Sequence, residues 1–107
     1  MEKEYVMATT TTPSGESADK IALALVQKRL AACVQIVEPI TSYYRWEGSI
    51  QKDREHLLII KTLKKHIPEI SRSLSQMHPY DVPELIAMPV VSGSTDYLSW
   101  LMESVGA

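Results

Sequence analysis

Apolar residues along the chain of 107 residues follow two different spacings. Short runs of apolar and β-branched residues favour β-strands, and such runs occupy residues 5–12, 32–46, 53–63 and 85–91. Apolar residues three or four positions apart favour amphipathic helices, and this spacing occupies residues 14–30, 67–77 and 95–105. The expected order is β-α-β-β-α-β-α, which is an α+β chain.

Two β-α-β units joined by a hairpin build the ferredoxin-like split fold. We therefore predict a single domain over residues 1–107, a βαββαβ sandwich followed by a C-terminal helix. In this fold the first and third strands are central, and the second and fourth form the edges. Proline cannot donate a hydrogen bond to a neighbouring strand, so it is confined to edges and bulges. Pro39 and Pro89 fall in the second and fourth expected strands, which agrees with this arrangement.

The hairpin formed by the second and third strands is long for so small a domain, and we expect it to extend beyond the helices. Exposed strand edges pair with other chains, so we predict a closed oligomer with residues 39–50 in the contact. Tyr44 and Trp46 share one face of this hairpin. Because tyrosine and tryptophan are enriched at interfaces and pocket rims, we expect these two residues at such a place.

The composition, with 45% hydrophobic and 22% charged residues, is typical of a globular protein. No apolar run approaches the roughly 20 residues that a membrane span needs. The net charge of −2 lacks the basic surplus of a nucleic-acid-binding surface. The acidic start has no apolar stretch behind it, so we expect no signal or transit peptide. A single cysteine is typical of a reducing compartment, and these features together predict a cytoplasmic protein that binds neither nucleic acid nor membranes.

Cys33 lies between an expected helix and an apolar strand. A reactive thiolate would need nearby cations, and Lys28 and Arg29 are about one helical turn earlier. The alternative is a buried cysteine with a structural role, which is the commoner case for a lone cysteine in an apolar segment. We favour this second interpretation, which predicts a thiol that reacts slowly in the native protein.

The segment 78–84 (HPYDVPE) holds an imidazole, a phenol and two carboxylates between two prolines. Imidazole with carboxylate is a donor set for Cu²⁺ or Zn²⁺, so His78 and Glu84 are candidate metal ligands. The alternative is a rigid loop whose polar groups hydrogen-bond to its own backbone. Tight Zn²⁺ or copper sites use three or four strong donors, so we expect divalent cations to bind weakly.

Lys61 ends the apolar run of the third strand. A lysine at that position is either partly buried and paired, or it lines a pocket for an anion. The sequence holds no glycine-rich phosphate loop, and no Ser-His-Asp arrangement or catalytic pair of carboxylates can be assembled from it. We therefore expect a protein without enzymatic activity.

Five motifs, in this order, resemble the CutA divalent-cation tolerance proteins, and together they span nearly the whole chain. The motifs are residues 30–34 (LAACV), 41–48 (TSYYRWEG), 61–62 (KT), 78–85 (HPYDVPEL) and 95–101 (TDYLSWL). The resemblance implies a ferredoxin-like subunit in a compact homotrimer, similar to the PII signalling proteins, with hairpins that pair between subunits. It also implies a role in tolerance of divalent cations, copper above all, and no established enzymatic activity.

The resemblance carries over only part of the copper site of the bacterial family members. Those members have a cysteine at the end of the first strand, where alignment places Thr10, and two adjacent histidines, where Met77 and His78 stand. A hydroxyl and a thioether are poor ligands for Cu²⁺, so the resemblance implies weak copper binding. Four matching residues are expected to frame a pocket between subunits: Tyr44, Trp46, Lys61 and Glu84.

Two functions are compatible with these features. The first is a metal-responsive homotrimer whose cation binding depends on His78. The second is a PII-like signalling or scaffold trimer that binds a small anion or a protein partner in the clefts between subunits. Titration with Cu²⁺ and Zn²⁺, beside a His78→Ala variant, would separate them.

Overall fold

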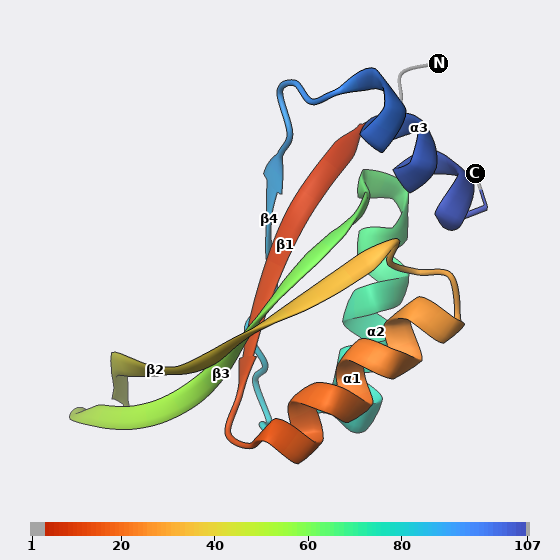
Figure 1. The fold of residues 1–107 in the computed structure, drawn as a ribbon. Helices are drawn as coiled ribbons and strands as arrows, with labels where there is room; N and C mark the ends of the chain where they lie inside the picture. The colour runs from red at the N-terminus through yellow and green to blue at the C-terminus, as the bar shows by residue number, and fades with distance from the viewer. Residues whose placement is uncertain (1–3, 107) are drawn as a thin grey trace.

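The computed structural model describes residues 4–106, which form a four-stranded antiparallel sheet and three α-helices. Figure 1 shows α1 and α2 side by side on one face of the sheet and α3 near its end. The elements are β1 (Tyr5–Thr12), α1 (Gly15–Gln27), β2 (Cys33–Trp46), β3 (Ser49–Leu63), the 3₁₀ helix η1 (Lys64–His66), α2 (Ile67–Met77), β4 (Ile86–Pro89) and α3 (Thr95–Ser104). The predicted βαββαβ order with a C-terminal helix is confirmed.

The core lies between one face of the sheet and the two helices α1 and α2. Alternate residues of β1, such as Ala8, point to this face, and Ala8 pairs with Ile60 of β3. Ile21 and Leu25 of α1 are fully buried against this layer. The alternation in the strands and the spacing in α1 thus place the apolar side chains on one shared core.

Helix α1 ends at Gln27, three residues before the predicted end at residue 30. Arg29 adopts a left-handed conformation with φ of 59°, and the Leu30 N–H donates to the Leu25 carbonyl at 3.0 Å. Helix ends with a left-handed residue and this hydrogen bond normally have glycine at the left-handed position. Because arginine occupies that position here, the sequence did not indicate where α1 ends. The predicted start is confirmed, because the Ser14 hydroxyl accepts a hydrogen bond from the backbone of the first turn at 3.1 Å.

Strands β2 and β3 form a hairpin that extends beyond the helices (Figure 1), as predicted. Glu47 and Gly48, with φ of 50° and 82°, make the two-residue turn, and positive φ at both positions is the requirement of a type I′ turn. Strand β2 has a bulge between Val37 and Ile40: it advances three residues there, while the paired strand β3 advances two. Beyond the bulge, therefore, residues of opposite parity in β2 face the same side of the sheet.

The strand order β2-β3-β1-β4 places β1 and β3 in the centre and β2 and β4 at the edges. Pro39 lies in the bulge of β2 and Pro89 ends β4, so the edge positions predicted from these prolines are confirmed. Strand β4 is shorter than the predicted residues 85–91, because its pairing with β1 begins at Ile86 and ends at Pro89.

Helix α3 covers one end of the second face of the sheet. There Leu101 and Val105 of α3 pack with Leu63 of β3. The register places Ile86 and Met88 of β4 on the same face, where they are 60% and 51% exposed. A sheet face with exposed apolar side chains is a candidate contact surface.

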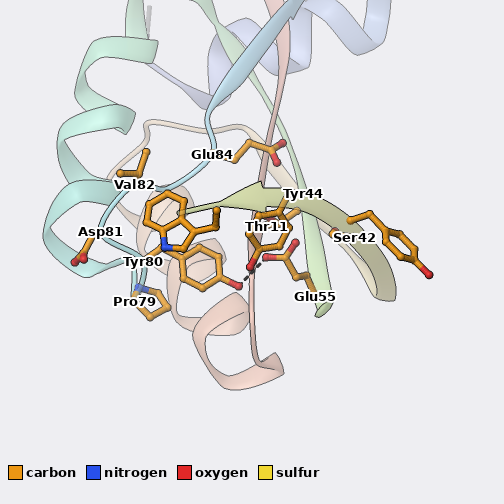
Figure 2. A pocket seen from close by; sticks show the side chains of 11 residues that line it. Thr11, Ser42, Tyr44, Glu55, Pro79, Tyr80, Asp81, Val82 and Glu84 are labelled. Atoms are coloured by element: carbon orange, nitrogen blue, oxygen red, sulfur yellow. Dashed lines mark hydrogen bonds between the residues drawn. The ribbon is translucent and has the colours of Figure 1, made fainter. Parts of the chain in front are cut away.

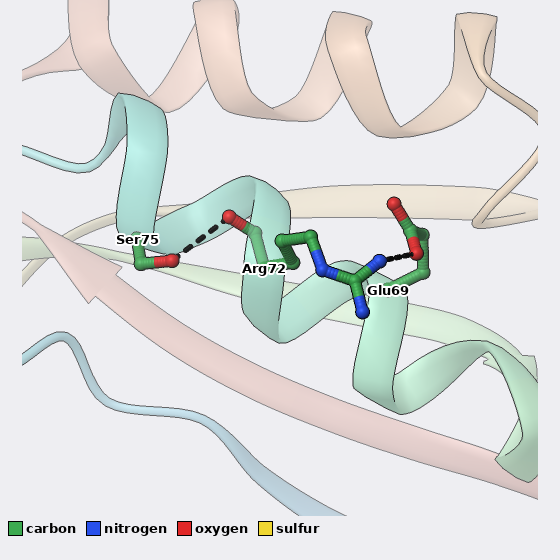
Figure 3. A network of polar contacts seen from close by, with 3 residues as sticks. All are labelled: Glu69, Arg72 and Ser75. Atoms are coloured by element: carbon green, nitrogen blue, oxygen red, sulfur yellow. Dashed lines mark hydrogen bonds and ion pairs between the residues drawn. The ribbon is translucent and has the colours of Figure 1, made fainter.

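Helix α2 carries a polar network on its solvent-facing side (Figure 3). Arg72 pairs with Glu69, and the Ser75 hydroxyl donates to the Arg72 carbonyl at 2.9 Å. The two charged side chains are 62% and 50% exposed, and ion pairs this exposed contribute about 0–1 kcal/mol. The attachment of α2 therefore depends on Ile70 and Leu74, which are buried in the core.

His66 ends η1, and its imidazole is partly buried. Partial burial, together with the charge of Lys65, lowers the pKa of this imidazole below its ordinary value of 6.5. The unfolded chain therefore takes up this proton first as the pH falls. The contribution of neutral His66 to stability is therefore fully present above the pKa of this histidine in the unfolded chain. It is lost as the pH falls through the lower pKa in the folded chain.

We expect the free energy of unfolding to decrease as the pH falls below about 6.5, the unfolded-state pKa of histidine, and part of this decrease to belong to His66. Urea unfolding midpoints, measured from pH 8 to pH 5 for the native chain and for His66→Gln, check the prediction. The native midpoint should fall more steeply than that of the variant. Parallel curves would mean that His66 makes no contribution.

Candidate functional site

A cavity of about 650 Å³ lies between the β2–β3 hairpin and the loop that joins α2 to β4. Beyond the bulge in β2, Tyr44 and Trp46 face the same side of the sheet as Glu55 of β3, and all three line this cavity. Seven of the lining residues carry charge or an aromatic ring with a polar group: Tyr43, Tyr44, Trp46, Glu55, Tyr80, Asp81 and Glu84. Figure 2 shows Tyr80 and Glu55 facing each other inside the cavity.

Three hydrogen bonds hold the polar groups of this site. The Tyr80 hydroxyl donates to the Glu55 carboxylate at 2.7 Å, which connects the loop to β3 (Figure 2). The Thr9 hydroxyl donates to the Glu84 carboxylate at 2.8 Å, which connects β1 to the end of the same loop. Tyr44 donates to Asp53 across the hairpin. The loop is therefore fixed to two strands by carboxylate hydrogen bonds.

Both tyrosines keep their protons at neutral pH. Burial, followed by the hydrogen bond to Glu55, raises the pKa of Tyr80. The hydrogen bond to Asp53 raises the pKa of the exposed Tyr44. Each phenol is therefore a neutral donor, and the charge of the cavity comes from its carboxylates.

Among the residues that the structure describes, the lining contains three carboxylates, those of Glu55, Asp81 and Glu84, and no lysine, arginine or histidine. Glu55 is 5% exposed, whereas Asp81 is exposed and Glu84 is half-buried. The electrostatic character of this site is therefore negative, which favours a cation over an anion.

Glu55 is not among the residues predicted for this site, because its neighbours in the sequence suggest an exposed hairpin. Residues 52–55 (KDRE) are all charged, a pattern typical of a solvated strand end. Tyr80 reaches Glu55 from a position 25 residues further along the chain, and sequence spacing does not indicate such a contact. The only available indication was the position of this carboxylate directly before the apolar run 57–60 (LLII).

His78 is buried outside the cavity, and both of its ring nitrogens are hydrogen-bonded to backbone. Nε2 lies 2.8 Å from the Thr11 carbonyl, and Nδ1 accepts from the Tyr80 N–H at 3.1 Å. A carbonyl can only accept, so Nε2 carries the proton and Nδ1 supplies its lone pair to Tyr80. This bonding leaves no ring nitrogen free for a metal. The Nδ1 bond holds the backbone of the loop itself, and the Nε2 bond connects the loop to β1.

We expect His78→Ala to destabilise the fold, because it leaves two backbone groups without partners. Each unpaired buried group costs about 1–3 kcal/mol, so the free energy of unfolding should fall by about 2–4 kcal/mol. Urea unfolding measures this change. His78→Gln keeps one donor and one acceptor and should lose less, and an equal loss in both variants would contradict the hydrogen-bonding role.

The other predicted residues lie in different surroundings. Lys61 is not part of the cavity, and its ammonium lies 5.6 Å from the ring centroid of Tyr97 in α3. Cys33 is half-buried rather than buried, because it begins an edge strand on the face that α1 and α2 do not cover; its register partner is Lys61. The cavity thus contains Tyr44, Trp46 and Glu84 of the predicted pocket but not Lys61.

Comparison with known proteins places this fold and site in a family. A family profile described as "CutA1 divalent ion tolerance protein" matches residues 6–104. The chain belongs to the CutA1 family. It is 48% identical over 96 residues to the divalent-cation tolerance protein CutA of Thermus thermophilus, covering 90% of this chain and 93% of that protein. It is 46% identical over 99 residues to the chloroplast CutA protein of Arabidopsis thaliana, covering 92% of this chain but 54% of that protein.

A solved CutA1 structure has the same fold. The CutA1 protein of the psychrotrophic bacterium Shewanella sp. SIB1 superposes with a TM-score of 0.93 at 37% identity, and the match covers 100% of both chains. The resemblance to CutA proteins and the predicted fold class are therefore both confirmed. No helix within residues 4–106 is long and apolar enough to cross a membrane.

Two positions at which copper-binding CutA proteins are expected to carry ligands face the core of this chain. Thr10 is fully buried, and its hydroxyl has no hydrogen-bond partner within residues 4–106. Met77 packs against the core cluster of α1 and α2. Within residues 4–106, no three histidine, cysteine, aspartate or glutamate side chains come close enough to hold a metal ion together. The donors present therefore do not fit a tight copper or zinc site.

Proposed function

We propose that this CutA1 chain acts in divalent-cation tolerance as a cytoplasmic homotrimer without enzymatic activity, and that its cavity binds divalent cations weakly. The observation that carries this proposal is the charge of the lining: Glu55, Asp81 and Glu84 face the cavity, and no basic side chain of residues 4–106 does. A negative, water-accessible cavity concentrates cations.

The donors favour hard cations over copper. Carboxylate and phenol oxygens line the cavity, and oxygen ligands suit Mn²⁺, Mg²⁺ and Ca²⁺, whereas Cu²⁺ prefers imidazole or thiolate. His78 already uses both ring nitrogens. We therefore propose that any copper binding is weaker than in family members with a cysteine and two histidines, and that it depends on carboxylates rather than on His78.

The homotrimer is proposed from the uncovered face of the sheet and the projecting hairpin. Ile86 and Met88 expose apolar side chains on the face, and Tyr43 and Ile50 are 68% and 67% exposed on the hairpin. Removal of such surfaces from water at about 25 cal/mol per Å² stabilises association. Association into a closed ring also pairs the free edges of β2 and β4.

A second candidate, a PII-like signalling or scaffold trimer, is supported by the same exposed hairpin, which offers a surface for a protein partner. Its small-anion version has no support at this cavity, because the described part of the chain places no cationic side chain in the lining.

Calorimetric titration with Mn²⁺ and with Cu²⁺ tests the proposed function. Glu84→Gln removes one charge and keeps an acceptor for the Thr9 hydroxyl, so we expect it to weaken Mn²⁺ binding severalfold. Glu103→Gln removes an exposed carboxylate on α3 and should leave Mn²⁺ binding unchanged. If neither Glu84→Gln nor Glu103→Gln changes Mn²⁺ binding, the metal does not bind in the cavity. If copper binds tightly and His78→Gln abolishes that binding, His78 is the copper ligand.

A further inference from the structure

Glu55 is a buried carboxylate without a cationic partner among residues 4–106. It is 5% exposed, and its side chain accepts one hydrogen bond, from the neutral Tyr80 hydroxyl at 2.7 Å. The two ion pairs among residues 4–106, Lys64–Glu4 and Arg72–Glu69, lie elsewhere. Because buried charges are almost always paired in stable proteins, this carboxylate indicates a site that a cation completes.

The surroundings of Glu55 combine this charge with aromatic and apolar side chains. Tyr44, Trp46 and Tyr80 line the cavity together with Val82. The faces of tyrosine and tryptophan rings attract cations, and their carbon surfaces stabilise an apolar body through burial. A volume of about 650 Å³ is within the range of small-molecule sites. The cavity therefore has room for an organic ligand.

The carboxylate of Glu55 and the surrounding aromatic rings offer few ligands to a metal ion. Mg²⁺ and Ca²⁺ bind tightly only when several oxygens replace their water, and within the described chain no three carboxylate, histidine or cysteine side chains converge. An ammonium group needs less: one carboxylate for its N–H donors, and aromatic faces for its charge and its carbon chain. The aromatic rings serve this ligand and contribute little to a hydrated metal ion.

We propose that the cavity binds a small organic ammonium ion, with its charged head at Glu55 and its apolar body against Tyr44, Trp46 and Tyr80. This inference rests on the proposed function in one respect, since both treat the cavity as a cation site. It differs in the occupant, which is an alkylammonium compound rather than a metal ion.

Titration of the full chain with butylammonium, followed by calorimetry and by tryptophan fluorescence, tests this inference. 1-Butanol is the matched neutral probe, because it has the same number of heavy atoms and no charge. We expect butylammonium to bind and to change the Trp46 emission, and 1-butanol to bind at least tenfold more weakly. Trp100 lies on α3 outside the cavity, so the emission change should persist in Trp100→Phe.

Glu55→Gln keeps the shape and an acceptor for Tyr80 but removes the charge, so it should weaken butylammonium binding at least tenfold, the loss of one charge-assisted hydrogen bond. The matched control, Glu103→Gln, should bind like the native chain. Equal binding of the two probes, or butylammonium binding that Glu55→Gln leaves unchanged, would overturn the inference.

A parallel Mn²⁺ titration separates this inference from the proposed function. Mn²⁺ binding that Glu84→Gln weakens, without butylammonium binding, would leave the proposed function standing and overturn the ammonium site. Butylammonium binding without Mn²⁺ binding would support the ammonium site and overturn the metal proposal. If neither cation binds, both proposals are wrong, as they would be if a basic side chain of a neighbouring subunit occupied the cavity.

Discussion

Replacement of Leu58 by alanine should lower the free energy of unfolding by about 2–5 kcal/mol. Leu58 is fully buried at the centre of β3, where it pairs with Thr10 of β1 and Ile36 of β2. The change removes three carbon atoms from a core that also includes Ile21 and Leu25. The loss of stability has two parts. The favourable free energy of burying those atoms away from water is lost, and the cavity left behind removes packing contacts of the neighbouring side chains.

Urea unfolding at a fixed chain concentration measures this loss, because association adds a concentration-dependent contribution to stability. Leu23→Ala is the matched control: it makes the same chemical change in α1 at a side chain that is 59% exposed. We expect that control to change the free energy of unfolding by less than about 0.5 kcal/mol. Similar losses at Leu58 and Leu23 would mean that the core does not lie between α1, α2 and the sheet.

The parts of the fold that sequence predicts well depend on local, repeated patterns. Alternation and helical spacing identified every strand and α-helix of the described chain. The prolines at residues 39 and 89 identified the edge strands, because a residue without an N–H cannot donate a hydrogen bond to a neighbouring strand in any fold. The end of α1 was missed, because Arg29 occupies a left-handed position that glycine usually marks.

The functional site was predicted less well, because its contacts join distant parts of the chain. The resemblance to CutA proteins identified Tyr44, Trp46 and Glu84, which all line the cavity. Glu55 acquires its role only through the Tyr80 hydroxyl. The imidazole of His78, with two carboxylates close by in the sequence, suggested a metal ligand. Only the structure shows that its two ring nitrogens point toward backbone groups.

The second large effect concerns assembly. We expect the native chain to sediment as a homotrimer, at three times the 12.0 kDa mass of the subunit, and Ile86→Asp to sediment as a monomer. Ile86 is 60% exposed on the uncovered face of the sheet, so an aspartate there should remain solvated in the isolated subunit. In a trimer that buries this face, the same carboxylate would lose its water without gaining a partner, which costs several kcal/mol.

Three-fold symmetry makes the effect large, because one substitution places the same unpaired charge at every copy of the interface. Ile50→Asp tests the hairpin separately: Ile50 is 67% exposed and lies in the predicted contact, residues 39–50, so this variant should also dissociate. Leu23→Asp is the matched control, since it puts the same charge at an exposed leucine on α1, and it should remain trimeric. A trimer that persists in Ile50→Asp but not in Ile86→Asp would place the contact on the sheet face alone. A native chain that sediments as a stable monomer at micromolar concentration would show that the uncovered face and the long hairpin have another partner, and would remove the support for a homotrimer.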